Sequence, residues 1–182
     1  MSALPQPAWT IRPEAPCDAA RIETLNAEAF GPGRFAKTAY RLREGVASVA
    51  DLGMVAVEDS LLRGSVRFWP IRVGGVEALL LGPLAVQSDQ RGRGIGIALM
   101  QASIERARQG PWPCILLVGD ESYYARVGFA RVLPGRMKFP GPVDPARVLG
   151  LSLKPGRLLD LGGEIKRAHP GDTVAADGAG VG

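Results

Sequence analysis

A glycine-punctuated turn between an apolar strand and an amphipathic helix is the feature that most constrains this chain of 182 residues. The run Leu81–Val86 predicts the end of a buried strand, and a helix is expected from about Gly94 to Gln109. The first N–H groups of a helix lack internal partners, and the helix dipole is positive there. Because glycine has no Cβ, a phosphate can come close to such a backbone. The segment therefore indicates either a diphosphate site or a plain turn.

The spacing of the glycines excludes two common phosphate ligands. A dinucleotide fingerprint requires G-x-G-x-x-G/A, but the sixth position is Ile97 when counted from Gly92 and Leu99 when counted from Gly94. A P-loop requires Gly-Lys-Ser/Thr, which does not follow here. NAD and ATP are therefore poor candidates for this turn.

The rest of the chain predicts one mixed α/β domain. Helical spacing after a cap at Asp18 predicts a first helix that ends at Gly31, and a shorter second helix is expected between Phe35 and Gly45. Short connections through Asp59-Ser60 and Gly74-Gly75 predict an antiparallel meander. The expected strands are Trp9–Pro13, Met54–Glu58, Leu61–Val73, Val76–Val86, Cys114–Val118, a strand from Phe129 and Val148–Leu153, with a short helix Tyr123–Val127 ended by Gly128.

Composition bounds the class of protein. Hydrophobic residues make up 46% of the chain, which suffices for one core, and no apolar run has the length of a membrane span. The net charge of +4 comes without a dense basic run, so neither nucleic acid nor a membrane is an expected partner. Cys17, Cys114 and the single His169 have no metal-ligand or disulfide spacing. We expect a cytoplasmic protein with a domain over residues 1–167, and a flexible tail over 168–182.

Two motifs resemble those of a known superfamily. Arg91-x-x-Gly94-x-Gly96 resembles the R/Q-x-x-G-x-G/A acetyl-CoA motif of the GNAT superfamily of acyl-CoA-dependent N-acetyltransferases. Tyr124-Ala-Arg-Val-Gly-Phe129 resembles the Y-x-x-x-G-F motif of the same superfamily, and it follows the strand after which the family places it. The resemblance covers roughly residues 9–132 and is nearest to the bacterial YhbS-like branch.

The resemblance implies a fold and an activity. The fold is a single α/β domain of the α+β type, with a mixed, mostly antiparallel central sheet, a splayed strand pair and flanking helices. The activity is transfer of an acetyl group from the cosubstrate acetyl-CoA to a primary amine of a small molecule or protein, by direct attack through a tetrahedral intermediate and without a metal. The acceptor is unidentified, and homodimers are common in this superfamily.

The resemblance also implies which residues hold the cosubstrate. The pantetheine arm would bond to the backbone of Leu84 and Val86 beside a strand that splays from Cys114–Val118, and Pro83 is consistent with a bulge there. An N–H near Ala85 or Val86 would stabilise the oxyanion. The diphosphate would be held by Arg91, Gly92, Arg93, Gly94, Ile95 and Gly96.

Catalytic roles are implied for two further side chains. Tyr124 would donate a proton to the leaving sulfur, because an ordinary phenol is protonated at neutral pH. Asp120 is the first choice for the base, with Glu121, Glu58 and a water relay as alternatives. Leu117 stands where many relatives have an asparagine that contacts CoA.

Two questions stay open at the level of sequence. Arg34, Arg41 and Arg43 could attract an acidic acceptor, or they could form a solvated helix face. The weakly defined base leaves room for a non-catalytic module that senses acetyl-CoA or CoA without turning it over.

Overall fold

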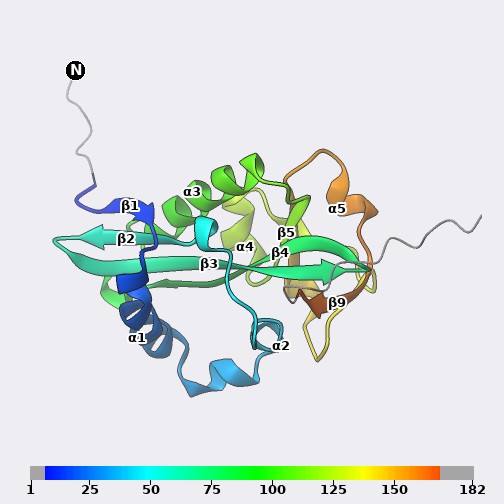
Figure 1. Cartoon of the computed structure of the whole chain (residues 1–182), viewed down its shortest axis with the longest axis horizontal. Coiled ribbons are helices and arrows are strands. Elements are labelled where there is room, and N and C mark those ends of the chain that lie inside the picture. Colours follow the sequence, from blue (N-terminus) through cyan, green and yellow to red (C-terminus); the bar gives the residue numbers. More distant parts are fainter. Residues whose placement is uncertain (1–6, 169–182) are drawn as a thin grey trace, which may run out of the picture.

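The structure, a computed structural model, describes residues 7–168. Its strands form one continuous sheet, and helices cover both faces of that sheet (Figure 1). The strands are β1 Thr10–Pro13, β2 Met54–Glu58, β3 Leu61–Val73, β4 Val76–Val86, β5 Cys114–Val118, β6 Ala130–Arg131, β7 Met137–Lys138, β8 Val148–Ser152 and β9 Gly163–Arg167. The helices are α1 Ala19–Phe30, α2 Thr38–Arg41, α3 Ile95–Gln109, α4 Glu121–Tyr124 and α5 Arg157–Asp160, with short 3-10 turns between them.

The sheet is mixed and mostly antiparallel, as predicted. Its strand order is β1-β2-β3-β4-β5-β8-β6, and β9 joins β3 to β7. The β2–β3–β4 meander forms because Asp59, Ser60, Gly74 and Gly75 all take positive φ, which the two tight turns require. Among the strand pairs of residues 7–168, only β4–β5 and β7–β9 run parallel.

The two long helices lie on opposite faces of the sheet (Figure 1). Helix α3 packs on β2, β3 and β4, and it buries Ile95, Leu99 and Met100 against Phe68. Helix α1 packs on β3 and β4 through Ile22 and Leu25. Both helices thus fix the position of the β4 end, which runs into the glycine turn.

Strands β4 and β5 separate after a short parallel ladder. Their pairing is limited to Leu79 with Ile115 and Leu80 with Leu116, although β4 continues to Val86. The register of β4 against β3 shifts between Val66 and Phe68, opposite the Gly82-Pro83 peptide, which is cis. The expected splay and bulge are therefore both present.

Three local expectations were wrong. Asp18 does not cap α1 with its side chain: its buried carboxylate accepts bonds from Arg12, at 2.7 and 2.9 Å, and from the N–H of Ala15. The second helix is broken at Lys37, whose backbone is extended, because the buried Thr38 donates its hydroxyl to the distant Pro142 carbonyl. The short helix expected from Tyr123 begins earlier, at Glu121.

Other differences lie toward the C-terminal part of the chain. The strands β7 and β9 and helix α5 were not predicted, since each is short and gains its order from tertiary pairing. The predicted tail lies outside the described residues except for Ala168. No helix among residues 7–168 is long and apolar enough to cross a membrane.

Candidate functional site

The glycine turn leaves open space in front of helix α3. Gly92 and Gly94 take φ of +80° and +81°, a left-handed conformation that glycine adopts without strain. A Cβ built on either residue would meet no atom within 4 Å, so the glycines are needed for the backbone path and leave the space above them empty. The turn therefore presents bare backbone, as a phosphate cradle requires.

The first amides of α3 are available for a ligand. The first internal bond of the helix joins the N–H of Ala98 to the carbonyl of Gly94 at 3.0 Å. The N–H groups of Ile95, Gly96 and Ile97 precede that bond and have no partner among the described residues. A helix of 15 residues also adds the positive end of its dipole at this point.

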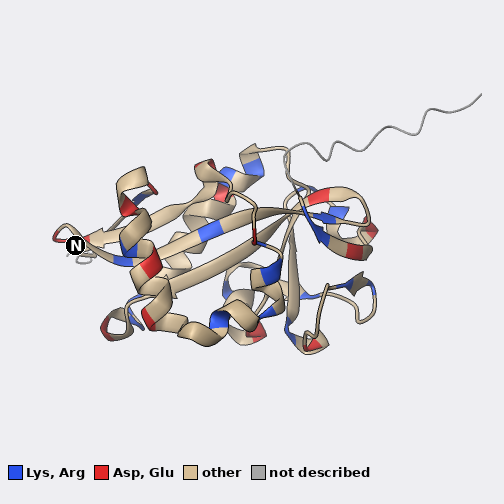
Figure 2. Ribbon diagram, turned by 60° about the horizontal axis from the view of Figure 1, so that its bottom comes forward, with Lys and Arg blue, Asp and Glu red and all other residues tan. Residues whose placement is uncertain are grey.

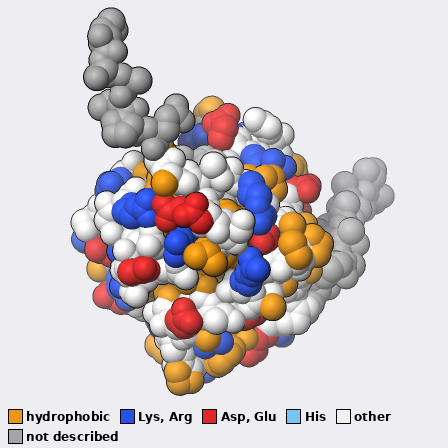
Figure 3. Space-filling view, turned by 90° about the vertical axis from the view of Figure 1, so that its left-hand side faces the viewer, with side chains coloured by type: hydrophobic (Ala, Val, Ile, Leu, Met, Phe, Trp, Pro, Cys, Tyr) orange, Lys and Arg blue, Asp and Glu red, His pale blue; other side chains and the backbone are white. Residues whose placement is uncertain are grey.

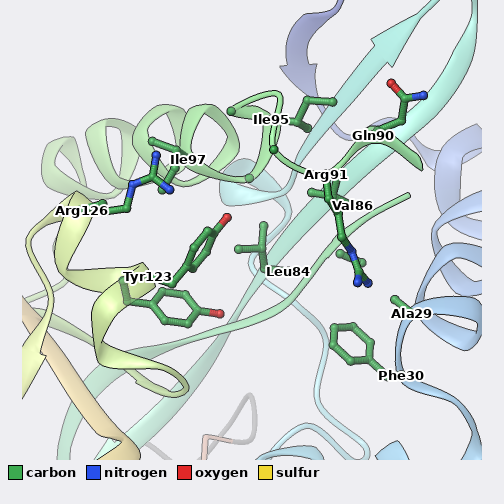
Figure 4. Close-up of a pocket in the computed structure, with 15 residues that line it drawn as sticks. Ala29, Phe30, Leu84, Val86, Gln90, Arg91, Ile95, Ile97, Tyr123 and Arg126 are labelled. Atoms are coloured by element: carbon green, nitrogen blue, oxygen red, sulfur yellow. The ribbon is translucent and has the colours of Figure 1, made fainter. Parts of the chain in front are cut away.

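These amides border a cavity of about 370 Å³, which we call the glycine-lined cavity. Its wall is made by Ala29, Phe30, Leu84, Ala85, Val86, Gln90, Arg91, Gly92, Gly94, Ile95, Gly96, Ile97, Tyr123, Tyr124 and Arg126. Figure 4 shows Arg91 and Arg126 on opposite sides of the cavity, with Leu84 and Val86 between them. The two cations flank the bare backbone of the turn.

Arg93 is not brought into this cavity. Its guanidinium forms an ion pair with Glu58, at 2.7 and 3.1 Å, and also donates to Gln90. Glu58 accepts a further ion pair from Arg63, and the pKa of the Glu58 carboxyl is lowered chiefly by its hydrogen bond from Arg93. Arg93 thus ties the glycine turn to the end of β2.

Strand β4 directs unused backbone groups into the gap beside β5. The N–H of Gln87 donates to the carbonyl of Arg63 on β3. Ala85, two residues before Gln87, lies opposite Ser65. Hydrogen-bonded pairs alternate along an antiparallel ladder. The backbone N–H and C=O groups of Ala85 therefore point toward β3, while those of Leu84 and Val86 point away from it. The backbone of Leu84 and Val86 is therefore free toward the gap.

Tyr124 lies where the gap opens. Its ring packs over Gly119, at which any Cβ would clash with the ring, and it meets Phe129 edge to face at 6.0 Å between centroids. Burial raises the pKa of the Tyr124 phenol to about 12, although Arg147 and Arg43 act in the opposite direction. The phenol is therefore protonated at neutral pH and can donate to a group in the cavity.

Tyr123 and the other glycines have structural roles here. The Tyr123 hydroxyl lies against Gly96, where a Cβ would displace it, so Gly96 is required for packing as well as for backbone access. Gly128 takes φ of +96° at the end of the turn that follows α4, as the helix-end interpretation predicted.

The acidic candidates lie outside the cavity. Asp120 caps α4, where its carboxylate accepts from the N–H and hydroxyl of Ser122, and Glu121 is paired with Arg131. With Glu58 held by Arg93, none of these three carboxylates lines the glycine-lined cavity. The assignment of the base to Asp120 stays a prediction.

A second cavity, of about 320 Å³, lies on the other side of Tyr124. We call it the arginine-lined cavity, because its wall includes Arg34, Lys37, Arg43 and Arg67. It shares Phe30, Leu84 and Tyr124 with the glycine-lined cavity, so the two spaces meet at the phenol. Arg41 does not line it and lies instead against Gly141.

Charge is interspersed over the outside of the molecule. Figure 2 shows that charged residues lie mainly on helices, loops and strand ends. On the face seen in Figure 3, basic and acidic side chains alternate without a continuous basic area. That face lacks the clustered charge typical of a nucleic-acid site.

Sequence comparison places these features in a known family. A family model described as "Acetyltransferase (GNAT) domain" matches residues 50–131, which contain the glycine turn and Tyr124. A curated relative, the uncharacterized N-acetyltransferase YhbS of Escherichia coli K12, is 33% identical over 122 residues, which are 65% of this chain and 72% of the relative. The chain belongs to the GNAT family of N-acetyltransferases.

Solved structures agree in fold with this chain. Escherichia coli YhbS, solved in complex with CoA, superposes with a TM-score of 0.75 at 26% identity, over 92% of this chain and 94% of that one. A GNAT family acetyltransferase from Brucella melitensis, solved in complex with acetyl-CoA, gives a TM-score of 0.62 at 28% identity, over 81% and 89% of the two chains. The mixed, mostly antiparallel sheet with flanking helices is thus the family fold.

Sequence reasoning missed six residues that line the glycine-lined cavity, namely Ala29, Phe30, Gln90, Ile97, Tyr123 and Arg126. Arg126 lies two residues after Tyr124, and its guanidinium is 5.9 Å from the Tyr123 ring centroid. Its place inside the Y-x-x-x-G-F motif was the available signal. Phe30 comes from the end of α1, and nothing in the sequence indicates that this end reaches the cavity.

Proposed function

We propose that this protein transfers the acetyl group of acetyl-CoA to a primary amine of a small molecule or protein, by direct attack of the amine through a tetrahedral intermediate. One observation carries the proposal: the two motifs, far apart in the sequence, border one cavity at the point where β4 and β5 separate. Family membership and two relatives solved with CoA or acetyl-CoA support it.

The residues present fit acetyl-CoA as a cosubstrate. A diphosphate needs donors and positive charge, and the free amides of residues 95–97 with Arg91 supply both. Arg126, on the opposite side, offers a second cation for an anionic group of the same ligand. Arg93 contributes by holding the turn through Glu58.

The gap suits the extended pantetheine arm. Its amides would extend the sheet by bonding to the free backbone of Leu84 and Val86, in the way that an added strand does. Since the Ala85 N–H faces β3, we assign the oxyanion donor to the N–H of Val86, of the two candidates.

Tyr124 is the proposed acid. When bound, acetyl-CoA supplies an activated thioester, whose sulfur leaves as a thiolate unless it is protonated. The buried phenol, with its pKa raised to about 12, is protonated at neutral pH and so can donate a hydrogen bond or its proton to the departing sulfur. Asp120 or a relayed water remains the proposed base.

The test combines binding with turnover. Calorimetry should show saturable binding of acetyl-CoA, and release of free thiol should appear only when an accepted amine from a broad panel is added. Tight binding with no release for any amine or protein acceptor would favour a non-catalytic sensor. Absence of binding would overturn the proposal itself.

A further inference from the structure

Two arginines in the arginine-lined cavity differ in how their charge is compensated. Arg67 donates to Glu14 through Nε and Nη2, at 2.9 and 2.6 Å, and to Glu23 through Nη1 at 3.2 Å. Arg43 forms no side-chain hydrogen bond and no ion pair with any residue in the described range 7–168. Of these two guanidinium groups, that of Arg67 is neutralised by carboxylates and that of Arg43 is not.

Arg43 is fixed in place by its surroundings. The neighbouring Leu42 is 1% exposed and anchors the segment in the core. The Nε atom of Arg43 is fully buried without a partner, and Nη2 lies so close to Gly82 that a Cβ there would be 2.6 Å away. Burial lowers the pKa of the Arg43 guanidinium to about 10, because no anion offsets the loss of water.

The other two cations of the cavity are placed differently. The Arg34 guanidinium lies 4.2 Å from the Phe35 ring centroid and donates to the Gly31 carbonyl. The Lys37 ammonium lies 5.6 Å from the Phe30 ring centroid on an exposed side chain. Neither forms an ion pair among the described residues, but Arg34 has a carbonyl and a ring as partners and Lys37 has a ring and water, so the cation without a described partner is Arg43.

A second unpaired polar atom lies in the same wall. Asn26, 3% exposed, has a buried Oδ1 that accepts no hydrogen bond among the described residues. Buried polar atoms are nearly always satisfied, so each exception needs a cause. The wall therefore holds two polar side chains with an unpartnered buried atom, Arg43 and Asn26, and the cavity also reaches Tyr124.

We infer that the acetyl acceptor is a small amine that also carries a carboxylate, of the amino-acid class, and that Arg43 binds its carboxylate. The inference rests on the proposed function, because it identifies the arginine-lined cavity as the place of the amine. Arg43 is the guanidinium of this wall without a described partner, and a guanidinium can bind a carboxylate through two parallel hydrogen bonds. The volume of about 320 Å³ is at the low end of small-molecule sites, which span roughly 300–1,000 Å³.

The step balances without another reactant. The neutral amine nitrogen forms a C–N bond with the acetyl carbon, and the C–S bond breaks. The nitrogen loses one proton through the proposed base to solvent, the sulfur takes one from Tyr124, and Tyr124 regains one from solvent. Arg43 neither gains nor loses a proton, so it is a substrate-binding residue only.

The experiment compares matched acceptors by thiol release at saturating acetyl-CoA. The panel pairs each of the common amino acids with its carboxamide and its decarboxylated amine, and it adds an aminoalkyl phosphate. We expect kcat/KM to favour the carboxylated member of an accepted pair by at least about tenfold. Arg43→Gln should remove that preference by raising KM, while Arg43→Lys should restore part of it.

A neighbouring arginine supplies the control. Arg41, two residues away, is exposed and outside the cavity, so Arg41→Gln should leave the preference unchanged. The Kd of acetyl-CoA should be the same in all variants, and Arg43→Gln should not lower the melting temperature, because it removes an uncompensated buried charge. A merely structural arginine would lower the melting temperature and leave the ratio intact.

The outcomes separate the two proposals. The inference is overturned if the protein acetylates only amines that lack a carboxylate, or if it prefers the aminoalkyl phosphate. In either case, binding of acetyl-CoA leaves the proposed function standing. An unchanged preference in Arg43→Gln also overturns it. Failure to bind acetyl-CoA overturns the proposed function instead.

Discussion

The glycine-lined and arginine-lined cavities meet at Tyr124, but they are built in opposite ways. The first presents mainly backbone, from one strand, one turn and one helix start, with Arg91 and Arg126 at its sides. The second presents side chains from helix α1, from the segment between α1 and β2, and from strands β3 and β4. A site made of backbone depends on glycine at fixed spacing and so leaves a motif. A site made of side chains from distant segments leaves none.

The largest expected effect is on the group the cavities share. Tyr124→Phe removes the proton donor and keeps the ring, so kcat should fall about 10²-fold, the lower end of what general acids contribute. The Kd of acetyl-CoA should stay within about twofold, since the phenol would act only on the leaving sulfur. Steady-state kinetics with calorimetry measures both. Full activity in this variant would remove the acid role and, with it, the functional link between the cavities.

The next effect tests the backbone-built side. In Gly94→Leu a side chain enters the open space above the turn, and we expect the Kd of acetyl-CoA to rise about 30-fold, or about 2 kcal/mol. Gly156→Leu is the matched control, because Gly156 is also a left-handed N-cap with open space around it, at α5. Both variants should lose about 1–2 kcal/mol of stability from the positive φ. Equal Kd values in the two variants would contradict the cradle.

A smaller effect distinguishes the two arginines of the glycine turn. Arg91 lines the cavity, whereas Arg93 is paired with Glu58, so Arg91→Gln should raise the Kd of acetyl-CoA about tenfold and Arg93→Gln about twofold. When acetyl-CoA is titrated at two salt concentrations, its Kd should rise more steeply with salt for the wild type than for Arg91→Gln. The reverse ranking would mean that Arg93 leaves Glu58 to bind the ligand.

Much of the fold could be predicted from the sequence. The meander, helix α3 and strand β5 follow from hydrophobic period and turn residues, which act locally. The break at Lys37 could not be predicted, because it depends on Thr38 bonding a loop far along the chain. Asp18 misled for a nearer reason: its carboxylate binds the guanidinium of Arg12, six residues earlier, and does not cap the helix.

The site residues also divide into those that local sequence predicts and those that tertiary contacts decide. Leu84, Val86 and the glycines were placed by motif, and the structure brings them together around one cavity. Arg93 is held away by Glu58, a partner 35 residues distant. Among the three arginines considered for an acidic acceptor, only tertiary packing separates Arg43, inside the cavity, from Arg41, outside it.

The early end of the β4–β5 ladder has a consequence for how the chain behaves in a crowded solution. Exposed strand edges invite other chains to pair and aggregate. At the ends of the main strand order lie β1, with four residues, one of them proline, and β6, with two, which are poor templates for such pairing. The long stretch of unpaired β4 backbone instead faces a neighbour inside its own sheet. The fold thus keeps this unpaired backbone inside the sheet, away from the outer strands at which other chains pair.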